Sequence, residues 1–305
     1  MNYTFHQLLI FVKICETQSI TRASEELFLT QPAVSIQLKK FQDQFDIPLT
    51  EPIGRKIQIT DFGFEIAKVC KQIIHETKEI EIKELQYKGF LAGKLSISVV
   101  STGKYVLPYF MSDFIKKHPN IDISIDVTNK AAVIQNLTKN ETDFSLVSVL
   151  PEDLDLEVVN LLKNRLVLVG ANSTEIESKI SSQKLATLPL IFREKGSATR
   201  NAMEHFLKSK NIIPNYKLEL VSNEAVKQAV CAGLGFSIMP IIGMKGELAT
   251  ENLKIIETSG LPIETTWRLV YNRKKQLSPV ANAFIKHVKE VKNQVVEKFF
   301  GLDKL

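Results

Sequence analysis

The stretch from Phe62 to Tyr87 constrains the fold of this chain more than any other feature. It contains no proline, and its only glycine, Gly63, lies near its start. With a rise of 1.5 Å per residue, it predicts a single helix roughly 40 Å long. A seam of mostly apolar residues recurs along it at coiled-coil spacing: Ile66, Cys70, Ile73, Thr77 and Ile80. Such a seam needs a partner, either a second copy of the helix or the helix's own domain.

This predicted helix divides a chain of 305 residues, which is too long for one ordinary domain. The predicted parts are a domain over residues 1–60, a linker helix over residues 61–90, and a domain over residues 91–305. The glycines from Gly89 to Gly93 are expected to end the helix and to act as a hinge.

Three short helices are predicted in the first part of the chain. Apolar residues of 5–15 share one face, Ser19 is expected to cap a second helix, and Thr30 a third with Pro32 in its first turn. The third helix is expected to bury Val34, Leu38, Phe41 and Phe45. Residues 54–60 then predict a small β wing with Arg55 and Lys56 at its tip.

The third helix has the properties of a DNA recognition helix, whose N-terminal residues reach base edges in the major groove. Gln31 suits an adenine edge, Ser35 suits either base type, and Ile36 suits a thymine methyl group. The remaining hydroxyls and cations suit phosphates, which set register rather than sequence. The predicted DNA-binding residues are Ser19, Thr21, Arg22, Gln31, Pro32, Ser35, Ile36, Lys39 and Arg55. The alternative is a three-helix packing module that binds no nucleic acid.

Bulk charge does not support DNA binding. The net charge is +5, but the charges of residues 1–60 sum to zero, and the excess lies near the C-terminus. The prediction of DNA binding therefore depends on the arrangement of particular residues.

Several runs stand in a characteristic order: Ser19-Ile20-Thr21-Arg22-Ala23, then Leu29-Thr30-Gln31-Pro32-Ala33-Val34-Ser35, then Gly54-Arg55 and Thr60. Together they resemble the winged helix-turn-helix of LysR-type transcriptional regulators. The resemblance implies double-stranded operator DNA as a partner and a long helix that pairs two subunits. One departure is Leu49-Thr50-Glu51-Pro52, where that family usually reads Leu-Phe-Glu-Arg. The missing aromatic residue and cation predict weaker or shifted contacts between the wing and phosphate.

Beyond Lys94 the pattern alternates between strand and helix, which predicts an α/β domain with a mostly parallel sheet and helices on both faces. Crossings near Leu162 and Ile263 join two similar halves. The predicted lobes are residues 91–162 plus 266–305, and residues 163–265. A two-lobed α/β domain of this kind resembles periplasmic binding proteins and is expected to hold its ligand between the lobes.

Polar turns mark the candidate ligand site, because ligands of open α/β sheets lie beyond the carboxyl ends of strands and face helix N-termini. Helix N-termini attract anions, and Arg193, Thr199 and Arg200 would strengthen a carboxylate or phosphate site. The predicted effector-binding residues are Ser101, Thr102, Asn129, Ser148, Arg193, Ser197, Thr199 and Asn223. Helix capping is the alternative role for each one singly.

Four further runs resemble the LysR-type regulators of carbon-fixation operons: Ser101-Thr102-Gly103-Lys104-Tyr105, Asn129-Lys130-Ala131-Ala132-Val133, Arg193-Glu194-Lys195-Gly196-Ser197-Ala198-Thr199-Arg200 and Ser222-Asn223-Glu224-Ala225-Val226-Lys227-Gln228-Ala229-Val230. This resemblance implies a homodimer or a homotetramer with two kinds of dimer contact. It also implies a small anionic effector metabolite, such as a phosphorylated sugar. RNA polymerase is a further candidate partner.

Other classes of protein are less compatible with the sequence. No apolar run reaches the roughly 20 residues of a membrane span, no export signal is recognised, and the three separated cysteines suit a reducing cytoplasm. An enzyme is not expected, because the five histidines are scattered and catalytic motifs are missing; no cofactor is expected either. A periplasmic solute-binding protein would need an export signal and has no use for residues 1–90. A redox sensor based on Cys231 would lack a resolving cysteine in its lobe.

Overall fold

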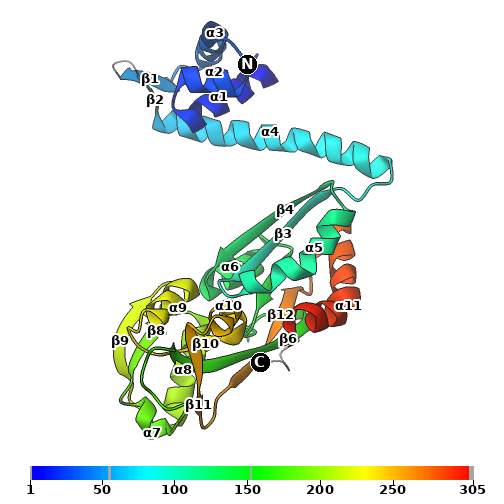
Figure 1. The fold of residues 1–305 in the computed structure, drawn as a ribbon. Helices are drawn as coiled ribbons and strands as arrows, with labels where there is room; N and C mark the ends of the chain where they lie inside the picture. The colour runs from blue at the N-terminus through cyan, green and yellow to red at the C-terminus, as the bar shows by residue number, and fades with distance from the viewer. Residues whose placement is uncertain (1, 54–55, 152, 302–305) are drawn as a thin grey trace. The chain divides into compact units, whose positions relative to one another are not determined.

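The structure, a computed structural model, describes residues 2–53, 56–151 and 153–301. The chain forms two compact units, residues 1–90 and residues 91–305. Figure 1 labels their helices and strands.

Over its described residues, the N-terminal unit consists of four helices and a β hairpin. Its elements are α1 (Phe5–Thr17), α2 (Ile20–Glu26), α3 (Gln31–Gln42), β1 (Thr50–Ile53), β2 (Lys56–Ile59) and α4 (Asp61–Tyr87). Strands β1 and β2 are antiparallel. Apolar side chains of α1, α2, α3 and the first half of α4 share one core. Figure 1 shows α1, α2 and α3 above α4.

Capping residues set the starts of the short helices. The hydroxyl of Thr4 accepts from the backbone N–H of Gln7 in a capping box, and the Ser19 hydroxyl accepts from the N–H of Arg22. Thr30 occupies the predicted N-cap position of α3, but its side chain makes no capping hydrogen bond. Helix α3 therefore begins where the sequence predicts, and Pro32 rather than a hydroxyl fixes its first turn.

The apolar seam predicted for α4 divides into two parts. Cys70 is buried against the core of its own unit, and Ile66 packs against the same core. Ile73 and Ile80, by contrast, are 41% and 70% exposed. The first half of α4 thus uses part of the seam to pack within its own unit, which is one of the two expected partners, and Ile73 and Ile80 stay exposed.

Gly63 shows how closely the start of α4 approaches the hairpin. A Cβ atom at this position would lie 2.1 Å from the carbonyl oxygen of Leu49 and 2.8 Å from a side-chain carbon of Ile59. Only glycine fits this approach, which explains the one glycine in the helical stretch.

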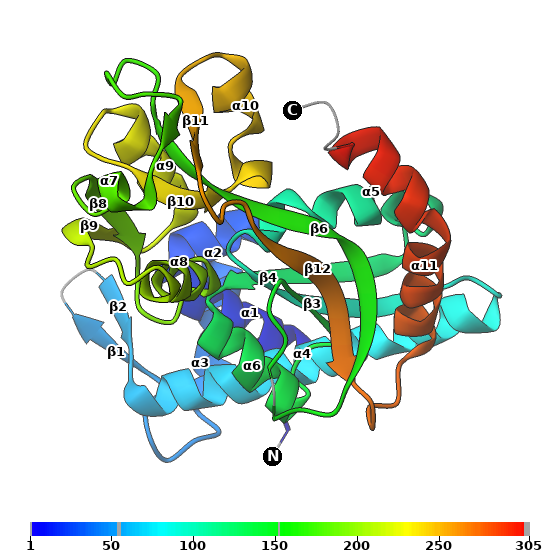
Figure 2. The same cartoon turned by 90° about the horizontal axis from the view of Figure 1, so that it is seen from below.

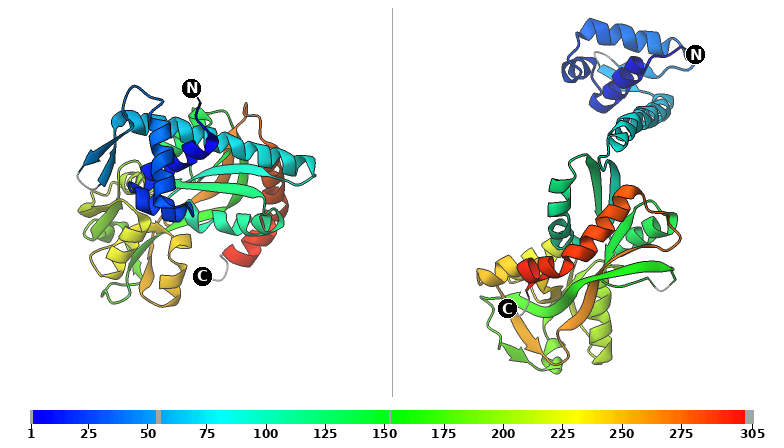
Figure 3. Two further views of the ribbon diagram at one scale, coloured as in Figure 1. Left: turned by 90° about the horizontal axis from the view of Figure 1, so that it is seen from above. Right: turned by 90° about the vertical axis from the view of Figure 1, so that its right-hand side faces the viewer.

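The first lobe of the C-terminal unit contains β3 (Gly93–Val100), β4 (Ile121–Thr128), β5 (Phe144–Val147), α5 (Leu107–Lys117), α6 (Lys130–Lys139) and α11 (Pro279–Phe300). Strand β3 pairs in parallel with both β4 and β5. Phe114 of α5 and Phe284 of α11 are 5.2 Å apart between ring centroids, so the two helices lie side by side (Figure 3). One apolar core unites these elements.

The second lobe contains β7 (Lys179–Ile180), β8 (Pro189–Arg193), β9 (Asn215–Leu220), β10 (Ser237–Pro240), β11 (Leu253–Thr258), α7 (Ser182–Leu185), α8 (Ala198–Ser209), α9 (Asn223–Cys231) and α10 (Lys245–Ala249). Leu166 and Leu168 contribute to a core with α8, whereas Val167 and Val169 contribute to a core with α9. Because successive strand residues point to opposite faces, helices cover both faces of this sheet.

Two long strands join the lobes. Strand β6 (Leu156–Ala171) pairs through its residues 156–166 with β12 (Ile263–Asn272), and Figure 2 shows the two strands running from one lobe to the other. The pairing is antiparallel, as are those of β12 with β5 and of β6 with β10 and β11. The sheet is therefore mixed, and the expectation of a mostly parallel sheet is corrected. The antiparallel pairings arise because β6 and β12 cross between the lobes in opposite directions.

Candidate functional site

Helix α3 presents two different faces. Val34, Leu38 and Phe41 are buried, as predicted. Residues Gln31, Pro32, Ile36 and Lys39 are exposed, Ser35 is half-buried, and Ile36 has 54% of its surface accessible. The exposed face thus carries an amide, a hydroxyl, an apolar side chain and a cation, which is the mixture that reads base edges and phosphates in a major groove.

Some cations of the N-terminal unit form ion pairs and others do not. Lys13 forms ion pairs with Glu16 at 3.2 Å and Glu26 at 3.1 Å, and Lys71 also pairs with Glu16. In the described part of the chain, no ion pair engages Arg22 or Lys39. Thr21 is exposed beside Arg22, whereas the hydroxyl of Ser19 is used to cap α2. Although the charges of residues 1–60 sum to zero, α2 and α3 therefore still carry cations that form no ion pair with a described residue.

Thr50 occupies the position where the LysR-type pattern has an aromatic residue, and its hydrogen bonds hold the wing. Its backbone N–H and its hydroxyl both donate to Oε1 of Gln42, at 3.1 and 2.6 Å. The hydrogen bonds tie β1 to the end of α3, a contact that the sequence did not reveal. Arg55, predicted at the tip of the wing, lies outside the described residues.

Six of the eight predicted effector-binding residues meet around one cavity of the C-terminal unit. They are Ser101, Thr102, Asn129, Arg193, Ser197 and Thr199; Lys130 and Glu194 also line it. The cavity has a volume of about 10 Å³. Ser148 and Asn223 are not among its lining residues. Turns from both lobes thus meet around one small space.

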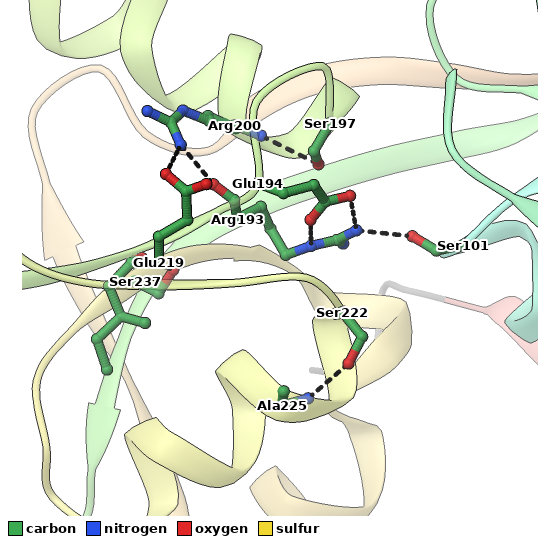
Figure 4. A network of polar contacts seen from close by, with 10 residues as sticks. Ser101, Arg193, Glu194, Ser197, Arg200, Glu219, Ser222, Ala225 and Ser237 are labelled. Carbon is green, nitrogen blue, oxygen red and sulfur yellow. Dashed lines mark hydrogen bonds and ion pairs between the residues drawn. The ribbon is translucent and has the colours of Figure 1, made fainter. Parts of the chain in front are cut away.

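Arg193 is the central cation of this cavity, and it already has an anionic partner (Figure 4). Its Nε donates to Oε2 of Glu194 at 2.7 Å, and its Nη2 donates to Oε1 of the same carboxylate at 2.8 Å. Nη2 also donates to the hydroxyl of Ser101, across the lobes, at 3.1 Å. Arg193 is 4% exposed. The sequence analysis missed Glu194, although it directly follows Arg193.

Several predicted residues cap helices, which was the alternative role for each. Oδ1 of Asn129 accepts from the N–H of Ala132, and the Ser197 hydroxyl accepts from the N–H of Arg200. Asn223 differs, since it is 4% exposed and neither atom of its amide has a hydrogen-bond partner among the described residues. A buried unpaired amide is costly, so Asn223 is the residue of this set with the most to gain from a new partner.

Arg200 does not contribute to the cavity, contrary to expectation. Its Nε donates to Glu204 and its Nη1 to Glu219, both at 2.6 Å, and Nη1 also donates to the carbonyl of Arg193. Figure 4 shows the Glu219 contact. Burial alone would lower the pKa of the Arg200 guanidinium, but these carboxylates raise it above its ordinary value. Arg200 therefore supports the fold around Arg193.

A second polar bridge joins the lobes. The Tyr105 hydroxyl donates to Oε2 of Glu224 at 3.2 Å, and Lys227 pairs with Glu224 and Glu247 at 3.0 and 2.6 Å. Burial, followed by the charge of Glu224, raises the pKa of Tyr105 to about 12. The hydroxyl thus remains a donor at neutral pH.

The cysteines do not have the properties of redox sensors. Burial raises the pKa of Cys15 to about 12 and that of Cys70 to about 11. Burial and the charge of Glu247 also raise the pKa of Cys231. Because the thiolate is the reactive form, none of these thiols is activated.

Two family models match the chain. The bacterial regulatory helix-turn-helix protein of the lysR family matches residues 5–64, and the LysR substrate binding domain matches residues 88–293. The HTH-type transcriptional activator CmpR of Synechocystis sp. is 36% identical over 289 residues, covering 94% of this chain and 95% of CmpR. The RuBisCO operon transcriptional regulator of Allochromatium vinosum is 36% identical over 286 residues, covering 93% and 95%.

Solved structures agree with these matches. The regulatory domain of CcmR from Synechocystis, in complex with 2-PG, aligns with a TM-score of 0.63 and 33% identity, covering 66% of this chain and 97% of that chain. Full-length CbnR, complexed with its target DNA, aligns with a TM-score of 0.70 at 19% identity, covering 94% and 99%, and supports the fold alone. In the described residues, no helix has both the length and the apolar character needed to cross a membrane.

A winged helix-turn-helix followed by a two-lobed α/β sensor domain defines a DNA-binding transcription regulator. The chain belongs to the LysR family of these regulators, and it is similar to members that control carbon-fixation operons.

Proposed function

We propose that this regulator reads its operator with the exposed face of α3 and that a small anionic metabolite controls it from the Arg193 cavity. Gln31, Ser35 and Ile36 would contact bases, while Arg22 and Lys39 would contact phosphates. Ser19, Thr21, Pro32 and Arg55 complete the proposed DNA-binding set. The mixed chemistry and exposure of α3 support this part of the proposal.

The effector part of the proposal depends on one observation: turns of both lobes bring six polar residues together around Arg193. A buried guanidinium among hydroxyls and the N-terminal turn of α8 suits a carboxylate or phosphate. The similar CcmR domain, solved in complex with 2-PG (2-phosphoglycolate), supports the same chemical class. Asn223, with its unpaired buried amide, is a further candidate contact, and so is Ser148 near the lobe crossing.

We also infer a homodimer or homotetramer in which copies of α4 pair through Ile73 and Ile80. Their exposure, at heptad spacing on a long helix, supports such a pairing. A symmetric pair would present two copies of α3 to a two-fold operator. We infer action in the cytoplasm, where operator DNA lies, and contact with RNA polymerase as the route to transcription.

The test uses the full-length protein with 2-phosphoglycolate as the probe. At 100 times its dissociation constant, a ligand that binds only the folded state adds about 2.7 kcal/mol of stability, which a thermal-shift assay detects. Arg193→Ala should lose most of this shift. The matched control is Arg273→Ala, because Arg273 is exposed and pairs with Asp155 and Glu157 away from the cavity.

An equal shift in the wild type and Arg193→Ala would refute the assignment of the cavity. A neutral compound that binds best and does not depend on Arg193 would refute the anionic class. The DNA-binding assignment is tested separately by the substitutions in α3.

A further inference from the structure

The guanidinium of Arg193 is engaged within its own chain through Nε and Nη2. Both of its hydrogen bonds to Glu194 are shorter than 3 Å, and together they form a bidentate salt bridge with the carboxylate. The remaining contact goes to Ser101. A ligand anion seeking the same two N–H groups would therefore find the position of its own carboxylate or phosphate occupied (Figure 4).

We propose that Glu194 is an internal competitor of the effector, and that the effector binds by displacing the Glu194 carboxylate from Arg193. The inference rests on the proposed anionic site and adds to it the residue that sets the affinity and the charge selectivity of that site.

The size of the cavity requires such a displacement. Its volume of about 10 Å³ is at the lower limit for one water molecule. Space for a metabolite must therefore come from a side chain that leaves. Glu194 is the lining residue whose departure would free both the space and the two donors of Arg193.

Glu194 is placed to leave without unfolding the loop. Its backbone N–H donates to the carbonyl of Leu220 at 3.1 Å, which anchors the main chain next to β9. Its side chain is 20% exposed, against 4% for that of Arg193. The carboxylate can thus turn toward water by side-chain rotation, while the guanidinium stays buried to meet the ligand.

The exchange predicts which anions bind well. A monocarboxylate replaces one negative charge by another and gains little over Glu194. A phosphate monoester brings additional negative charge and additional acceptor oxygens, and Lys130 on the wall of the cavity supplies a second cation for them. The site should therefore prefer phosphorylated metabolites to simple carboxylates, and neutral compounds should fail to displace Glu194.

The experiment measures binding of 2-phosphoglycolate and of glycolate to the full-length protein by isothermal titration calorimetry. Glu194→Gln keeps the shape of the side chain and removes its charge. Its affinity for 2-phosphoglycolate should rise at least about tenfold, because a unit charge at hydrogen-bond distance in a partly buried site is a strong competitor. Binding of glycolate should become measurable or strengthen similarly. The matched control is Glu264→Gln, which removes a carboxylate from Arg165 outside the lining of the cavity and should bind as the wild type does.

Suppose that Arg193→Ala does not bind 2-phosphoglycolate and that Glu194→Gln binds it no more tightly than the wild type. This result would overturn the competitor role of Glu194 and leave the proposed site intact. Absence of binding in both the wild type and Glu194→Gln would overturn the proposed anionic site and the competitor role with it. Thermal unfolding without ligand reports whether each variant folds. If Glu194→Gln does not fold, Glu194→Ala is the second variant, with the same expected rise in affinity.

Discussion

Val34 and Ile36 lie two residues apart on α3 and provide a direct test of its two faces. Val34 is 0% exposed in the core of the N-terminal unit, whereas Ile36 is 54% exposed. If α3 reads DNA with its exposed face, truncation of each side chain to alanine should affect a different property. Val34→Ala should lower the stability of the unit, and Ile36→Ala should lower the affinity for the operator.

The magnitudes follow from burial. Val34→Ala removes two buried carbon atoms at about 0.8 kcal/mol each and leaves a small cavity, so the free energy of unfolding should fall by about 2 kcal/mol. Ile36→Ala changes an exposed helical position, and stability should stay within about 0.5 kcal/mol. Loss of an apolar contact with a thymine methyl group should cost about 1 kcal/mol of operator binding, roughly a fivefold loss of affinity.

Two assays separate these effects. Urea unfolding followed by circular dichroism gives the stability, and fluorescence anisotropy at fixed salt gives the affinities for operator and scrambled duplexes. Ile36→Ala should reduce only the operator affinity, whereas Val34→Ala should leave the ratio of the two affinities unchanged at temperatures where it is folded. A loss of stability in Ile36→Ala comparable to that in Val34→Ala, or an unchanged affinity ratio, would refute the proposed orientation of α3.

Three further predictions concern base reading, assembly and pH. Gln31→Ala should weaken the free energy of binding by about 1–3 kcal/mol for the operator alone, whereas Lys39→Ala should weaken binding to all DNA sequences alike. An anisotropy titration in which both variants lose the same affinity for scrambled DNA would contradict these separate roles. A double variant in which lysine replaces both Ile73 and Ile80 should have a lower molecular mass in light scattering, while the sensor domain keeps its unfolding transition. An unchanged mass would exclude pairing through α4. Tyr105→Phe should lower the free energy of unfolding by about 1 kcal/mol below pH 10. This difference should vanish as the pH rises toward the raised pKa of Tyr105, about 12, because the ionised hydroxyl no longer donates to Glu224. A difference that persists above pH 12 in urea titrations would disprove the bridge.

Much of the fold and of the candidate site follows from local patterns. The spacing of Val34, Leu38 and Phe41 predicts the buried face of α3, and Ser19 predicts the start of α2. Turns after parallel strands place Ser101 and Asn129 near one another, because β3 and β4 are neighbours and end at the same edge. The buried face, the helix start and the position of these turns can therefore be predicted without knowledge of the tertiary contacts.

Contacts between distant elements were not predictable in this way. The split seam of α4 depends on which residues α1 already covers. The antiparallel pairings of β6 depend on strands β10, β11 and β12, and the spacing of residues within one strand does not reveal them. Arg193 and Arg200 have the same chemistry and flank one loop, yet only Arg193 faces the cavity. Glu204 and Glu219 hold Arg200 away from it, and they belong to two different elements.

The pairing of Arg193 with Glu194 changes how a predicted site should be judged. A sequence reports that an arginine is available near helix N-termini, but it does not report whether the protein itself supplies the counter-charge. In this cavity the counter-charge comes from the next residue, and the bond from Arg193 to Ser101 already joins the lobes without a ligand. Binding of an effector would therefore replace one anion by another instead of creating the bridge. The change on binding would then lie in the released side chain of Glu194, because Arg193 has an anionic partner both before and after the exchange.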